Sequence, residues 1–162
     1  MPRAEDYAQK IEEQLGESWL PRIYCERILK LRTRSYHFEN ANASARVVIQ
    51  HTLLGVELKI GRKRLLCPDL ATARYLSVFA RVGCQAVALP YDITKISHLA
   101  DELESSWYRM LLLVEQETKG ESTRFKARVR GLLLARIRAK IEEAGPGTRV
   151  PEFKQTTKQR QK

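Results

Sequence analysis

The sequence contains no long apolar run, because its densest apolar stretch, residues 110–114, is only five residues long. A membrane-spanning helix needs about 20 predominantly apolar residues, so the sequence excludes an integral membrane protein of that class. The N-terminal residues also lack the apolar segment of a secretory signal, which favours a cytoplasmic location.

Cysteine is scarce and is not spaced for metal or disulfide chemistry. The three cysteines, Cys25, Cys67 and Cys84, are odd in number and contain no C-x-x-C pair. This spacing argues against a disulfide framework or a structural zinc site, and it fits small buried side chains in a reducing cytosol. The sequence also lacks the P-loop, G-x-G-x-x-G and G-x-S-x-G motifs, so no motif predicts a nucleotide-binding loop or a serine nucleophile.

Positive charge is concentrated at one end of the chain. Residues 118–162 contain thirteen Lys or Arg and four Glu, and they carry nearly all of the net charge of +10. The preceding 117 residues contain sixteen basic and fifteen acidic side chains, so they are close to neutral. A balanced body with a basic segment is typical of a protein that faces a polyanion.

The hydrophobic periodicity predicts a mixed α/β fold, in which a small mixed sheet of about four strands is flanked by helices. Helical spacing is found in residues 4–15, 18–31, 69–82, 93–114 and 122–143. Residues 33–38, 45–60, 64–67 and 85–89 are predicted to form strands, with a bend at Gly55. We expect Asp69, Asp92 and Ser122 to cap helix N-termini, and Gly83 to end a helix.

The segments at 64–67, 69–82 and 85–89 together predict a right-handed βαβ crossover. In this arrangement the two strands are parallel neighbours, and the helix packs across them. The second strand is almost wholly apolar, which is typical of a strand buried on both faces of a sheet.

The charge pattern divides the chain into a mixed α/β body at 1–120, a basic amphipathic helix at 121–144 and a disordered basic tail at 145–162. The candidate nucleic-acid-binding side chains of the helix are Arg124, Lys126, Arg128, Arg130, Arg136, Arg138 and Lys140. Apolar residues recur every four positions between them, from Phe125 to Ile141. Two compatible interpretations stay open: the helix docks on the body with a solvated basic face, or its basic side chains neutralise phosphates. A membrane-surface helix is less favoured, because no Trp or Phe cluster accompanies the arginines.

A candidate catalytic pair lies on the strand that contains Gly55. Glu57 and Lys59 are two residues apart, so on a strand their side chains point to the same face. In metal-dependent phosphodiester hydrolysis, a Glu can hold a divalent cation and a Lys can orient the attacking water or stabilise the developing charge. The alternative interpretation is an ordinary solvated pair on an exposed strand.

The order of the elements, with Glu57-x-Lys59 at a strand end, resembles the core of the PD-(D/E)XK nuclease superfamily over residues 36–100, and in particular its VRR-type domains. The resemblance implies a nuclease that binds Mg²⁺ through Glu57 and an upstream acidic residue. The upstream Asp of the family motif is missing, since no Asp occurs between Asp6 and Asp69, and Glu39 is the candidate to replace it.

The sequence therefore predicts a nucleic-acid-associated protein that binds DNA, RNA or a ribonucleoprotein through its basic C-terminal helix and tail. Two alternatives stay open: a Mg²⁺-dependent PD-(D/E)XK-like nuclease, and a protein-interaction adaptor that uses its long helices. Tyr36 and Phe38, flanked by Arg32 and Arg34, offer a base-stacking platform on the first strand, and ordinary packing explains these aromatic residues as well. No cofactor is expected apart from the Mg²⁺ of the nuclease.

Overall fold

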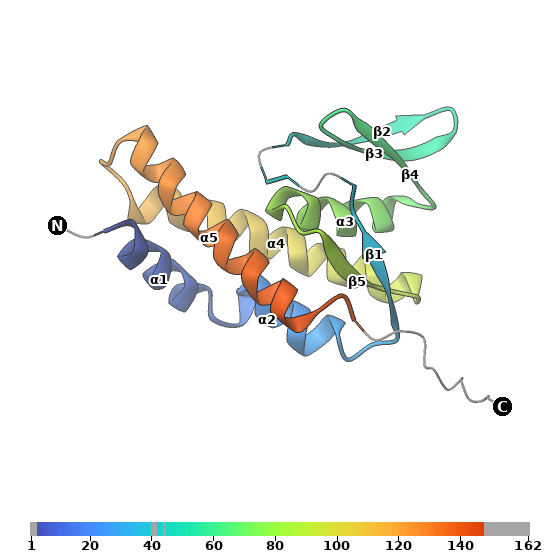
Figure 1. Ribbon diagram of the computed structural model, residues 1–162, viewed down its shortest axis with the longest axis horizontal. Helices are drawn as coiled ribbons and strands as arrows, with labels where there is room; N and C mark the ends of the chain where they lie inside the picture. Colours follow the sequence, from blue (N-terminus) through green and yellow to red (C-terminus); the bar gives the residue numbers. More distant parts are fainter. Residues whose placement is uncertain (1–2, 40–41, 44, 148–162) are drawn as a thin grey trace.

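The computed structural model describes residues 3–39, 42–43 and 45–147, and it confirms the mixed α/β class (Figure 1). The principal helices are α1 (Ala4–Leu15), α2 (Leu20–Ile23), α3 (Leu70–Val82), α4 (Ile93–Glu117) and α5 (Thr123–Ala144). A 3-10 turn at Gly16–Ser18 precedes α2, and a π-helical segment at Tyr24–Ile28 extends it. The strands are β1 (Thr33–His37), β2 (Val47–Thr52), β3 (Gly55–Ile60), β4 (Lys63–Cys67) and β5 (Ala86–Pro90).

The predicted helix boundaries are confirmed by their caps. The carboxylate of Asp69 accepts a hydrogen bond from the backbone N–H of Thr72 at 2.7 Å, and the Ser122 hydroxyl accepts one from the N–H of Phe125 at 3.1 Å. Gly83 ends α3 with a φ of 90°, a conformation in which a side chain is strained. These contacts satisfy backbone groups that a helix leaves without internal partners.

The strands form two antiparallel sheets instead of one mixed sheet. One contains β1 and β5, and the other contains β2, β3 and β4 in that order. We call the three-stranded unit the hairpin sheet. No parallel pair occurs among the described residues, so the predicted pairing of the strands at 64–67 and 85–89 is wrong.

Two tyrosine hydroxyls supply the hydrogen-bond partners that β5 would otherwise find on a neighbouring strand such as β4. The backbone N–H of Ala88 donates to the Tyr24 hydroxyl at 2.9 Å, and the Tyr75 hydroxyl donates to the Ala88 carbonyl at 2.6 Å. Buried backbone groups must find partners, and a neighbouring strand normally supplies them. Here side chains from the π-helical segment and from α3 take the place of that strand.

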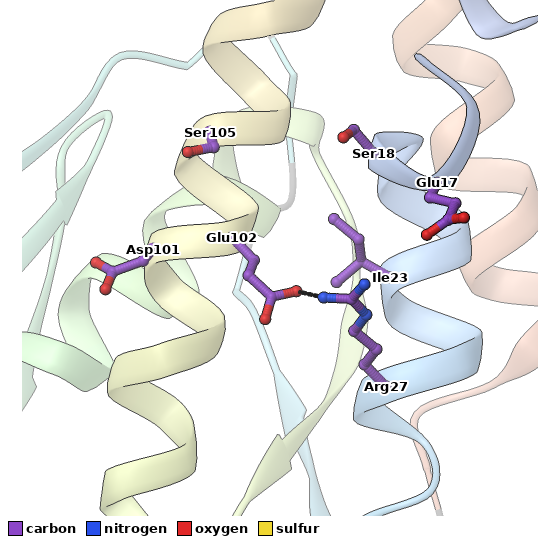
Figure 2. Close-up of a pocket in the computed structure, with 7 residues that line it drawn as sticks. All are labelled: Glu17, Ser18, Ile23, Arg27, Asp101, Glu102 and Ser105. Atoms are coloured by element: carbon purple, nitrogen blue, oxygen red, sulfur yellow. Dashed lines mark hydrogen bonds and ion pairs between the residues drawn. The ribbon is translucent and has the colours of Figure 1, made fainter.

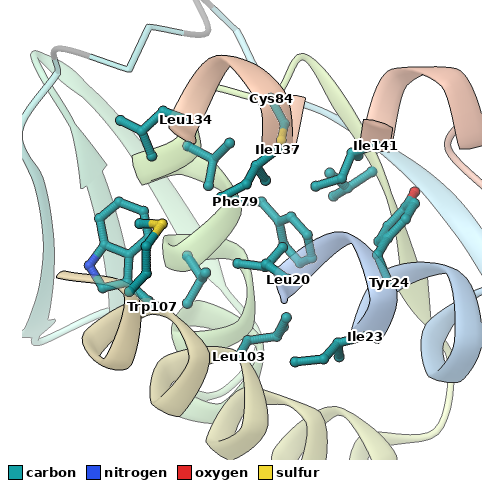
Figure 3. Close-up of a cluster of buried hydrophobic side chains, with 14 of the residues drawn as sticks. Leu20, Ile23, Tyr24, Phe79, Cys84, Leu103, Trp107, Leu134, Ile137 and Ile141 are labelled. Atoms are coloured by element: carbon teal, nitrogen blue, oxygen red, sulfur yellow. The ribbon is translucent and has the colours of Figure 1, made fainter. Parts of the chain in front are cut away.

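A single hydrophobic core extends through the helices and β5 (Figure 3). The α5 side chains Val129, Leu133, Ile137 and Ile141 are fully buried in it. The helix packs against α1 and α4, so α5 is an integral part of the body instead of an appendage. Its apolar stripe therefore docks, as one of the two interpretations expected.

The hairpin sheet lies over α3 (Figure 1). Leu58 and Cys67 are buried on its inner face, which packs against that helix. Side chains alternate along a strand, so Glu57 and Lys59 lie on the outer face. No described helix lies on this outer face, where Glu57 and Lys59 are partly exposed.

Candidate nucleic-acid interface

The basic side chains of α5 divide into two groups, and one group is engaged within the protein. Lys126 pairs with Glu115 at 3.0 Å, and Arg136 pairs with Glu12 at 3.1 Å. The guanidinium of Arg138 donates to the backbone carbonyl of Val82 at 2.7 Å. These three side chains fasten α5 to neighbouring elements, which is the role that the docked interpretation assigns to them.

The second group faces solvent near the N-terminal half of α5. Arg124, Arg128 and Arg130 are exposed, and none of them has a hydrogen-bond or ion-pair partner among the described residues. Arg124 and Arg128 are one turn apart, about 6 Å along the axis at 1.5 Å per residue. Lys140 is also exposed, and its ammonium group lies 3.9 Å from a Glu143 carboxylate oxygen, too exposed a pair to neutralise it strongly. Uncompensated cations on one helix suit contact with phosphates.

A second basic surface lies on the outer face of the hairpin sheet. Lys59 is opposite Val48 and Arg64, and Glu57 is opposite Gln50. A cavity of about 220 Å³ on this face is lined by Arg46, Val48, Gln50, Lys59 and Gly61. Arg46 and Arg64 were not among the residues predicted from the sequence to bind nucleic acid, although the basic run at 59–64 was a signal for Arg64.

Glu57 carries one of the two buried side-chain oxygens that lack a hydrogen-bond partner among the described residues; the other is Oγ1 of Thr33. Its Oε1 is buried and accepts no hydrogen bond from any described residue. A desolvated carboxylate oxygen is costly to leave without a donor or a cation. Lys59 shares the sheet face with Glu57, as expected, but no ion pair joins the two side chains.

The structure does not bring Glu39 to Glu57. Glu39 is exposed, and its carboxylate lies 3.5 Å from the ammonium group of Lys63. Lys63 lies on the same, inner side of β4 as Leu65 and Cys67, whereas Glu57 lies on the outer side of β3. No group of three or more His, Cys, Asp or Glu side chains able to hold a metal occurs among the described residues. The predicted Mg²⁺ site of Glu39 and Glu57 is therefore not assembled in this arrangement.

Tyr36 and Phe38 pack against each other instead of forming an open platform. Their rings meet edge to face with centroids 5.0 Å apart, and both are partly buried against the core. Burial raises the pKa of Tyr36 to about 12. Ordinary packing explains this pair, as one of the two interpretations expected.

The cavity between the helix at Leu20–Ile23 and α4 has the opposite charge (Figure 2). Its volume is about 330 Å³, and carboxylates from Glu17, Asp101 and Glu102 line it together with Arg27. Arg27 pairs with Glu102 there, and Asp101 pairs with Arg74 at 2.5 Å. An acidic cavity repels phosphates, so a polyanion is expected to bind elsewhere on the molecule.

No protein-family model, no curated protein and no solved structure matches the chain. Within residues 3–39, 42–43 and 45–147, no helix is both long and apolar enough to cross a bilayer.

Proposed function

We propose that this protein binds nucleic acid, DNA or RNA, through the exposed arginines of α5. The observation that supports this is that Arg124, Arg128 and Arg130 project from a docked, rigid helix without any counter-charge among the described residues. Ordered cations that the protein does not neutralise attract an external polyanion. Binding to phosphates also releases condensed counterions, which adds affinity without any sequence preference.

The hairpin sheet supports the same function with a second basic surface. Arg46, Lys59 and Arg64 have no ion-pair partner among the described residues, and Glu57 is the one acidic residue on these three strands. The basic residues of the tail that the sequence analysis assigned to binding lie at 149–162, outside the described residues. In the proposed function they add electrostatic affinity to that of α5.

A triple substitution tests the proposal with the full chain. Arg124→Ala, Arg128→Ala and Arg130→Ala together remove three charges, and the matched control replaces the same residues with Lys, which keeps the charge. Fluorescence anisotropy with labelled single- and double-stranded DNA and RNA, each with and without Mg²⁺, gives the affinity at several salt concentrations. The Mg²⁺ arms also report strand cleavage, which the nuclease alternative requires.

We expect the Ala variant to bind more weakly, and its plot of log affinity against log salt to be less steep by about 2 to 3 for duplex DNA. The Lys variant should retain the steep salt dependence, because the release of counterions requires only a positive charge near each phosphate. Equal affinity and equal salt dependence for the Ala variant and the unmodified chain would contradict the role of α5. The absence of binding to all four nucleic acids would contradict the function.

A further inference from the structure

An exposed tyrosine with two arginines stands where β1 starts and β5 ends, close to the start of α4 (Figure 1). The guanidinium carbons of Arg32 and Arg34 lie 5.1 and 5.6 Å from the centre of the Tyr91 ring. The backbone N–H of Tyr91 donates to the Arg32 carbonyl at 3.2 Å, which continues the β1–β5 ladder by one residue and places the Tyr91 backbone beside that of Arg32. Tyr91 is nevertheless 43% exposed, so a partner can reach it.

A cavity lies directly beside the ring. It has a volume of about 480 Å³ and is lined by Leu31, Arg32, Pro90, Tyr91, Asp92 and Lys95. This volume lies within the range typical of sites for small organic ligands. The lining combines apolar surface, one aromatic face and charged groups, which is the combination that a base with its phosphate requires.

The charge of this site is not balanced from within. Arg32, Arg34 and Lys95 have no ion-pair partner among the described residues. The single carboxylate, that of Asp92, accepts a hydrogen bond from the N–H of Thr94 at 2.9 Å as the N-cap of α4. Arg32 and Arg34 therefore lie over the aromatic ring and Lys95 lines the cavity beside it, and Asp92 is the one carboxylate among the residues that line this cavity.

We propose that this Tyr91 pocket holds one unpaired nucleotide of a nucleic-acid strand, a specificity that rests on the proposed function and deepens it. The Tyr91 ring and the planar faces of the two guanidinium groups stack on the base. Lys95 and the N–H groups at the guanidinium edges bind the adjoining phosphates. Only an unstacked base exposes its face to such a ring. The protein is therefore specific for single-stranded over double-stranded nucleic acid.

Tyrosine variants of the full chain test the pocket. Tyr91→Ala removes the ring, Tyr91→Phe keeps it, and Tyr108→Ala is the matched control, since Tyr108 is 59% exposed on α4 and has no arginine over its ring. The probes are a labelled single strand of about ten nucleotides, its duplex, the same strand with 2-aminopurine, and a free nucleoside monophosphate as competitor. Circular dichroism verifies that each variant is folded.

We expect Tyr91→Ala to weaken single-strand binding by about 5- to 150-fold, the range that loss of one stacked base implies. Tyr91→Phe and Tyr108→Ala should bind as the unmodified chain does, and duplex binding should be unchanged throughout. The 2-aminopurine fluorescence should be quenched on binding, except with Tyr91→Ala. Arg32→Gln combined with Arg34→Gln should reduce the single-strand salt dependence by about 1.4.

Other results separate the pocket from the proposed function. Strand binding that Tyr91→Ala and Tyr108→Ala leave equally strong, together with weaker binding by the α5 triple variant, overturns the pocket alone. Binding of the free mononucleotide at Tyr91 without competition from the strand also overturns it, because the site would then serve a small molecule. A chain that binds no strand and no duplex overturns the pocket and the proposed function together.

Discussion

Truncating Ile137 to alanine should destabilise the whole protein, because α5 belongs to its core. Ile137 is fully buried among side chains from other elements, including Leu20, Phe79 and Cys84 (Figure 3). Ile137→Ala deletes three carbon groups, and their transfer to water alone costs about 2.4 kcal/mol at ~0.8 kcal/mol per group. The cavity left behind raises the expected loss to roughly 3 to 4 kcal/mol.

The matched control is Arg128→Ala on the exposed side of the same helix. It should change the free energy of unfolding by less than about 0.5 kcal/mol, since Arg128 is exposed and has no hydrogen-bond or ion-pair partner among the described residues. Urea unfolding, followed by circular dichroism and by the fluorescence of the buried Trp19 and Trp107, measures both variants. For a chain of this length the Ile137→Ala loss corresponds to a melting temperature lower by about 6 to 16 °C.

The two variants should also separate stability from binding. Arg128→Ala is expected to weaken nucleic-acid binding with little effect on unfolding, and Ile137→Ala is expected to do the reverse at temperatures where it stays folded. If Ile137→Ala were no more destabilising than Arg128→Ala, α5 would not be part of the core. The separation of its docked and exposed faces would then be refuted.

Three further predictions concern the interior. Tyr24→Phe leaves the backbone N–H of Ala88 without its acceptor, so the free energy of unfolding in urea should fall by about 1 to 3 kcal/mol. Gly83→Ala strains a residue at φ 90° and places a Cβ 2.7 Å from the backbone nitrogen of Ala43, so it should lower the melting temperature, whereas a rise would refute the tight contact. Burial raises the pKa of Cys84 from 9.0 and that of Tyr24 from 10.0, each to about 12, so the folded state holds these protons more tightly than the unfolded chain. The contribution of these two groups to the free energy of unfolding should therefore be fully present below pH 9 and be lost as the pH rises towards 12. Urea unfolding midpoints measured between pH 8 and 11 should fall accordingly.

The elements of this protein follow from local sequence signals. Asp69 and Ser122 cap helices through side-chain bonds to N–H groups three residues ahead, and Gly83 ends a helix because its conformation excludes most side chains. Such interactions join residues that are close in sequence, so spacing alone identifies them. The apolar repeat of α5 also identified the face that docks, because helical geometry places every fourth residue on nearly the same side.

Only the tertiary structure decided how the strands pair. An apolar strand must find partners for its backbone, and sequence spacing suggested β4 as that partner. The hydroxyls of Tyr24, which is 64 residues from Ala88 in the sequence, and of Tyr75, on the preceding helix, satisfy Ala88 instead. Which side chain reaches an open strand edge depends on how distant segments pack, and no local pattern contains that information.

The features of the candidate nucleic-acid interface were likewise determined partly by the sequence and partly by the tertiary structure. The sequence by itself located the basic residues, and the spacing of Glu57 and Lys59 placed the pair on one strand face. The structure decided which cations remain free, because Arg136 and Lys126 meet acidic partners on other helices whereas Arg124 does not. Chain folding also determined that the Tyr91 ring is exposed to solvent, whereas the rings of Tyr36 and Phe38 pack against each other. Pairing and burial are properties of surfaces that meet in three dimensions, so they are settled only when the chain is folded.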